Sequence, residues 1–78
     1  MEQALLLIVL APSFKTETLA KLRKIAGVAS AHMLYGPYDM FATIKAKDIE
    51  ELRVAVIKIR ELEGIKSTIT CNVIQAQT

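Results

Sequence analysis

The sequence predicts an α+β domain in which four strands and two helices follow one another in the order βαββαβ. Three observations support this order. Short apolar runs are bounded by Gly, Pro or Asp, two segments have apolar residues at helical spacing, and one helix-to-strand joint occurs twice. With 78 residues, the chain is expected to form a single domain over residues 1–78.

Four segments are expected to be strands, because each is rich in apolar or β-branched residues and is bounded by turn-forming residues. They are Ala4–Leu10, Val28–Tyr35, Met40–Ala46 and Ile65–Ile74. The turn sequence Gly36-Pro37-Tyr38-Asp39 joins the second strand to the third, so these two should form a hairpin. Gln75–Thr78 is expected to be a loose tail.

Two segments have the spacing of helices. The first, Thr16–Ala26, opens with a threonine that can cap the helix and stops at Gly27. The second opens with Asp48 and Glu51, which have the spacing of a capping box. Apolar residues then recur every three or four positions until Gly64, at Ile49, Leu52, Val56, Ile59 and Leu62.

An internal repeat connects the two halves of the chain. Residues 22–30 can be laid over residues 59–67 so that Gly27 coincides with Gly64. The same joint between a helix and a strand is thus used twice, as in the two split βαβ halves of a ferredoxin-like fold. Right-handed crossovers would place both helices on one face of the antiparallel sheet.

The first strand is apolar in both directions, which predicts a dimer. Leu5, Leu7 and Val9 point one way, and the residues between them point the other. Apolar residues make up 53% of the sequence, against roughly 45–50% in an average domain. We expect the uncovered sheet face to pack on the same face of a second copy, giving a dimeric α+β barrel.

Several function classes are not expected. The single cysteine, Cys71, cannot form an internal disulfide, which favours the cytoplasm, and its alternation with Ile69 and Val73 predicts a buried, inert thiol. His32 lacks neighbours at metal-ligand spacing and is expected to be a structural strand residue. No cofactor or metal site is expected. Interleaved basic and acidic residues argue against nucleic-acid binding, and the longest apolar run is too short to cross a membrane.

Two groups of polar residues could bind a ligand. In the hairpin corner, Gly36 would let a ligand approach the backbone and Asp39 could pair with an ammonium group. In the last strand, Thr68 and Thr70 could offer hydroxyls to a carboxylate. Turn chemistry alone explains the corner equally well, and strand propensity alone explains the threonines.

Taken together, these segments resemble the effector-binding (RAM) domain of the Lrp/AsnC transcriptional regulators over about residues 3–74. The resemblance rests on the apolar first strand and four further segments, which are Leu22–Val28, Tyr35–Met40, Lys47–Leu52 and Leu62–Thr70. It implies a dimer joined through sheet faces, and an octamer built as a ring of four dimers. It also implies that an amino acid binds at the contacts between dimers.

The resemblance implies a ligand site at Tyr35, Gly36, Tyr38, Asp39, Thr68 and Thr70, with Asp39 as the partner of the amino group. The chain begins directly at the first strand, where most family members carry a helix-turn-helix domain. It is therefore similar to the stand-alone members, and is expected to lack direct DNA binding. Such a protein would sense amino acids alone or through mixed assembly with full-length regulators.

Alternatives to an amino-acid sensor remain open. The chain could be a structural or regulatory partner subunit with no ligand of its own. It could also be a small enzyme of the dimeric α+β barrel type, using His32, Tyr35, Tyr38 and Asp39, although no nucleophile–base pair is evident and no enzyme activity is expected. Amino-acid-binding domains of the ACT type share the same element order.

Overall fold

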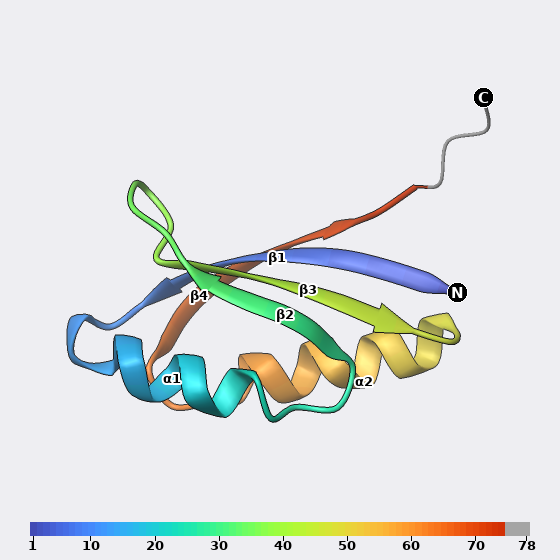
Figure 1. Cartoon of the computed structure of the whole chain (residues 1–78), viewed down its shortest axis with the longest axis horizontal. Coiled ribbons are helices and arrows are strands. Elements are labelled where there is room, and N and C mark those ends of the chain that lie inside the picture. Colours follow the sequence, from blue (N-terminus) through green and yellow to red (C-terminus); the bar gives the residue numbers. More distant parts are fainter. Residues whose placement is uncertain (75–78) are drawn as a thin grey trace.

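A computed structural model describes residues 1–74 of the chain as a four-stranded antiparallel sheet with both helices on one face (Figure 1). The strand order is β2-β3-β1-β4, so β2 and β4 are the edges. The elements are β1 (Glu2–Leu10), the short 3-10 helix η1 (Pro12–Phe14), α1 (Lys15–Leu22), β2 (Val28–Met33), β3 (Met40–Ala46), α2 (Ile49–Arg60) and β4 (Ile65–Asn72). The predicted α+β, ferredoxin-like order βαββαβ is confirmed.

Element ends differ from the prediction mainly at α1, which begins at Lys15 and ends at Leu22. Thr16 is therefore inside the helix, and the predicted cap there is wrong. After Leu22 the backbone changes to the tighter 3-10 type of turn. Lys24 there donates its N–H to the carbonyl of Lys21, only three residues back. Strands β2 and β4 each end two residues before the predicted positions. The predicted tail, residues 75–78, lies outside the described residues.

The predicted cap of α2 is present. The Asp48 carboxylate accepts a hydrogen bond of 2.9 Å from the backbone N–H of Glu51. The Glu51 carboxylate reaches back to the backbone N–H of Lys47, at 3.2 Å, rather than to that of Asp48. In a capping box this second bond would come from the N–H of Asp48, so the observed bond is displaced by one residue.

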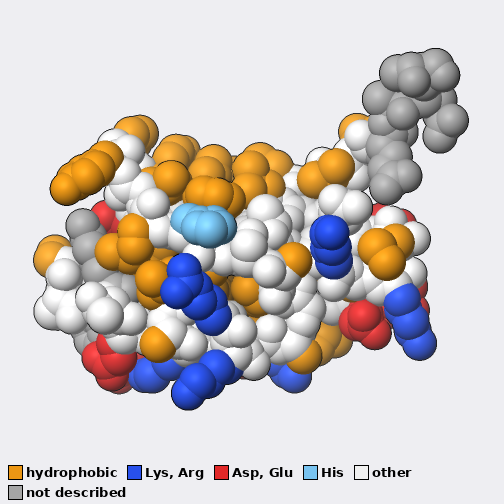
Figure 2. All heavy atoms as spheres, in the orientation of Figure 1, with side chains coloured by type: hydrophobic (Ala, Val, Ile, Leu, Met, Phe, Trp, Pro, Cys, Tyr) orange, Lys and Arg blue, Asp and Glu red, His pale blue; other side chains and the backbone are white. Residues whose placement is uncertain are grey.

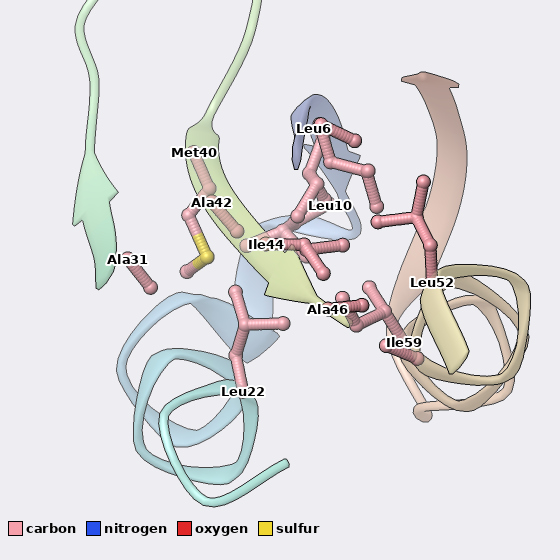
Figure 3. Packing of buried hydrophobic residues seen from close by; sticks show 13 residues of the cluster. Leu6, Leu10, Leu22, Ala31, Met40, Ala42, Ile44, Ala46, Leu52 and Ile59 are labelled. Atoms are coloured by element: carbon pink, nitrogen blue, oxygen red, sulfur yellow. The ribbon is translucent and has the colours of Figure 1, made fainter. Parts of the chain in front are cut away.

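The core lies between the helices and the sheet face that they cover (Figure 3). Leu6, Ile8 and Ile44 are completely buried there. The whole buried apolar cluster comprises Ala4, Leu6, Ile8, Leu10, Leu22, Ala31, Met40, Ala42, Ile44, Ala46, Leu52, Ala55 and Ile59. Gly27 lets the first helix-to-strand joint approach α2, since a Cβ at that position would lie 3.2 Å from the Cβ of Ala55.

No helix or strand that the structure describes covers the opposite side of the sheet, and we call this side the open face. Register places Leu7 between Phe41 of β3 and Ile69 of β4, and pairs Leu5 with Cys71. Figure 2 shows apolar side chains gathered along this upper side of the molecule. Cys71 is exposed there, so the prediction of a buried thiol is wrong for a single chain, because none of the elements within residues 1–74 covers the open face.

Candidate ligand-binding site

The hairpin between β2 and β3 forms a projecting corner (Figure 1). Tyr35 is fully exposed at this corner. Gly36 has φ of 129°, in the region that favours glycine, and open space surrounds the position that a Cβ would occupy. Tyr38 and Asp39 are half-buried where the chain rejoins the sheet. The corner can therefore meet another molecule without rearranging the core.

Asp39 ties this corner to the end of β1. Its carboxylate accepts a hydrogen bond of 2.8 Å from the backbone N–H of Leu10. Its own N–H donates to the carbonyl of Ile8, and its carbonyl accepts from Leu34, both at 2.9 Å. The side chain thus has a structural task that sequence reasoning missed, and this task fixes the position of the carboxylate.

The second group of polar residues lies beside α2. Helix α2 packs mainly over β3 and β1, so the helix side of the edge strand β4 is poorly covered. Thr68 and Thr70 pair with the buried Ile8 and Leu6, which places them on that side. From Thr68 to Asn72, strand β4 therefore turns its polar residues toward the helices and its apolar residues toward the open face.

Two hollows lie along this strip, and we call them together the α2–β4 trough. The first has a volume of about 210 Å³ and is lined by Ile49, Leu52, Arg53, Val56, Thr70 and Asn72. The second has a volume of about 310 Å³ and is lined by Arg60, Ile65, Lys66, Ser67 and Thr68. The trough therefore combines hydroxyl and amide groups with three basic side chains, and the lining of neither hollow includes an acid.

This composition suits a carboxylate ligand. Arg53 lies beside Thr70 in the first hollow, and Lys66 lies beside Thr68 in the second. Guanidinium, ammonium and hydroxyl groups all donate hydrogen bonds to carboxylate oxygens. Sequence reasoning identified the two threonines but missed the arginines. Arg53 and Arg60 are seven residues apart, so they lie near one side of α2. This spacing in the sequence could have identified them as a pair of basic residues on one helix side.

A single chain does not join the two groups into one pocket. None of the corner residues Tyr35, Gly36, Tyr38 and Asp39 lines either hollow. Asp39 binds the backbone of β1 from the β3 side, whereas Thr68 pairs with Ile8 from the β4 side. Two strand spacings, roughly 10 Å, therefore separate the corner from the trough within the sheet.

Other residues considered from sequence occupy ordinary positions. The rings of His32 and Phe41 are stacked, with centroids 5.0 Å apart, as in a cross-strand pair.

The part of the chain that the structure describes contains no cluster of three or more His, Cys, Asp or Glu residues able to hold a metal ion. Within the same residues, neither helix is long and apolar enough to span a membrane.

Comparison with known proteins identifies the family. The model of the Lrp/AsnC ligand binding domain matches residues 3–77. The chain belongs to this family. The resemblance seen in the sequence is therefore confirmed over almost the entire chain.

Relatives carry this domain as one part of longer proteins. An uncharacterised HTH-type transcriptional regulator of Pyrococcus horikoshii is 31% identical over 55 residues, which are 69% of this chain and 37% of that protein. A homocitrate synthase of Saccharolobus islandicus is 32% identical over 62 residues, which are 80% of this chain and 13% of the synthase. The chain thus spans about a third of the curated regulators that it matches.

Solved structures show the same fold. A protein from Thermus thermophilus is 30% identical and matches with a TM-score of 0.91, covering 100% of this chain and 99% of that chain. AsnC of E. coli is 28% identical with a TM-score of 0.87, covering 99% of this chain and 53% of that chain. The domain therefore has the size of the Thermus protein and of about half of AsnC.

Proposed function

We propose that this Lrp/AsnC domain is a sensor for a free amino acid, that it acts in the cytoplasm, and that it catalyses no reaction. The observation that carries the proposal is the match of a ligand-binding domain to residues 3–77. The cytoplasm suits the exposed thiol of Cys71, because thiols stay reduced there.

The first element of the proposal is a dimer in which two open faces pack together as an α+β barrel. Leu5, Leu7 and Val9 are only half-buried in the single chain. Completing the burial of an apolar side chain of this size stabilises a protein by about 1.5–3 kcal/mol. In a two-fold dimer each of these positions occurs once in each subunit, so its contribution to stability counts twice. The dimer would also cover Cys71.

The second element is a composite ligand site, in which the corner of one subunit closes over the trough of a subunit from a neighbouring dimer. Asp39 would pair with the ligand's amino group, and Thr68 and Thr70 would donate to its carboxylate. The acidic corner and the basic trough complement each other in charge. The exposure of Tyr35 and Gly36 also supports contact with another subunit.

Such a site would couple ligand binding to assembly. A ligand held between two dimers binds the assembled state better than the separated dimers, and linkage then requires that it strengthen assembly. The assembly could be a ring of four dimers or a mixed oligomer with full-length Lrp/AsnC regulators. Both described helices pack on the sheet, so the proposal assigns no DNA contact to residues 1–74.

A partner subunit without a ligand of its own is the second candidate, and the uncovered open face favours it. The same domain in a homocitrate synthase relative supports a role as a regulatory module attached to different proteins. This candidate predicts assembly with a helix-turn-helix relative that does not respond to any amino acid.

The test combines thermal unfolding with light scattering after size exclusion, without ligand and then with each common amino acid. We expect one amino acid to raise the melting temperature and to change the molar mass. Asp39→Asn should weaken that response, because it removes the charge while retaining an oxygen that can accept the Leu10 bond. Asp48→Asn is the matched control, since it removes the same charge from an exposed helix cap.

If none of the amino acids changed the melting temperature or the molar mass, the result would contradict the proposal of an amino-acid sensor. Co-purification with a helix-turn-helix relative under those conditions would support the partner subunit instead. Equal loss of the response in Asp39→Asn and Asp48→Asn would contradict the assignment of Asp39 to the site.

A further inference from the structure

The outward side of α2 exposes two β-branched apolar side chains. Val54 is 48% exposed and Ile57 is 47% exposed. The described side chains of α1 include no large apolar residue that is exposed to this degree. Both helices cover the same face of the sheet, yet among their described side chains only those of α2 form an exposed apolar patch.

Charges of opposite sign lie at the two ends of this patch. The first turn of α2 contains Glu50 and Glu51, and the last turn contains Lys58 and Arg60. Glu50, Val54 and Lys58 are spaced four residues apart, so they lie on one side of the helix. Complementing the helix macrodipole explains the order of the charges, but it does not explain the exposed valine and isoleucine between them.

We propose that α2 pairs antiparallel with α2 of a second copy of this chain, around a two-fold axis that passes near Val54. Glu50 and Lys58 are each four residues from Val54, so the pairing brings the acidic end of each helix to the basic end of the other. Val54 lies against its own copy at the centre, and Ile57 packs beside it. A parallel pairing would instead place Glu50 beside Glu50, and the charges therefore select the antiparallel arrangement.

The existing partner of Glu50 does not prevent this pairing. Glu50 contacts Arg53 on the same helix at 3.3 Å, but both side chains are largely exposed. Exposed pairs of this kind contribute little to the stability of a helix, because water screens both charges. A carboxylate between Arg53 and the second copy's Lys58 can contact both.

The location of α2 gives this contact a role in assembly. Helix α2 covers the sheet face opposite to the open face (Figure 1), so both surfaces can be occupied at once. Two different two-fold contacts on one chain allow dimers to join one another into closed assemblies. This role in linking dimers rests on the proposed open-face dimer, whereas the α2 contact itself does not.

Complementary charge reversal tests the contact. Glu50→Lys alone and Lys58→Glu alone each place like charges at both ends of the pair, and should weaken the association about tenfold. A 1:1 mixture of the two variants restores an attractive contact at both ends, and should recover the wild-type molar mass. The measurement is light scattering after size exclusion over a range of protein concentrations at low salt, where surface charges are least screened.

Glu17→Lys is the control, because it reverses an exposed glutamate on α1 that has its own partner at 3.6 Å, Lys21. It should leave the mass unchanged. Single variants that keep the wild-type mass, or a mixture that stays as small as its components, would overturn the proposal. Helix destabilisation by the reversed charges cannot produce recovery on mixing.

Measured without any amino acid, so that the ligand-linked contact between corner and trough is not strengthened, the outcome also separates the α2 contact from the open-face dimer. If only the α2 contact exists, the wild type is a dimer that Glu50→Lys converts to a monomer. If only the open-face dimer exists, the wild type is a dimer that Glu50→Lys leaves unchanged. If both exist, the wild type is larger than a dimer and Glu50→Lys reduces it to a dimer.

Discussion

The two faces of the sheet use similar residues but have different surroundings. On β1, Leu6 and Ile8 point toward the helices and are completely buried, whereas Leu5 and Leu7 point to the open face and remain half-buried. Nothing in the composition of the strand distinguishes the two sets. The position of the helices does, and it divides the apolar residues of one strand between a core and a face that no described element covers.

Strand β4 differs from β1, because between Thr68 and Cys71 its helix side is polar and its outward side is apolar. Its polar residues Thr68 and Thr70 face the helix side, while Ile69 and Cys71 face outward with the open face. An edge strand of a lone monomer would be expected to show the opposite pattern. The reversal is consistent with an open face that binds a second subunit and a helix side that binds a ligand.

The largest effect is expected for Leu6→Ala. This change leaves a cavity in the core beneath the helices, and comparable substitutions cost about 2–5 kcal/mol of folding free energy. Chemical denaturation should show the same loss at low and at high protein concentration. A loss that disappears at high concentration would mean that Leu6 stabilises a subunit contact rather than the core.

Leu7→Ala, the adjacent substitution on the other face, should cost less per chain and act through assembly. Complete burial of this side chain provides about 1.5–3 kcal/mol. The substitution loses part of this free energy in each of the two subunits of the dimer. The molar mass should therefore fall toward that of a monomer on dilution. An unchanged mass together with a loss of stability as large as that of Leu6→Ala would remove the distinction between the faces.

Much of the fold followed from local signals. The bond by which Asp48 caps α2 spans three residues, and the joints at Gly27 and Gly64 repeat a short pattern, so both were readable in sequence. The end of α1 was not, because the backbone tightens after Leu22 into bonds three residues apart although the apolar spacing continues to Ile25.

The candidate site was only partly predictable for a similar reason. Thr68 and Thr70 could be identified from the alternation along a single strand. Arg53 could not, because its place beside Thr70 depends on how α2 sits on the sheet. The bond between Asp39 and Leu10 joins residues that are 29 positions apart, and the exposure of Cys71 depends on which face of the sheet the helices cover.

A smaller effect is expected at the start of α2, the helix that covers the core and lines the trough. Asp48→Ala removes the side chain that accepts the Glu51 N–H, and the loss of such a cap costs about 1 kcal/mol. Asp48→Asn should cost much less, because asparagine caps helices about as well. Thermal unfolding of the two variants in parallel measures the difference, and equal losses would assign the effect to charge rather than to the cap.

The smallest effect on stability is expected for Thr70→Val, which tests the helix side of β4 as a ligand surface. Valine suits a strand, so the folding free energy should change by less than about 0.5 kcal/mol at this exposed position. The affinity for the effector should nevertheless fall by up to about tenfold, because one hydroxyl donor is lost. Thr43→Val is the matched control on the open face, where the hydroxyl bonds Ser30 at 2.6 Å. If titration calorimetry showed equal losses of affinity in both variants, the ligand would not distinguish the two faces, and the trough would lose its assigned role.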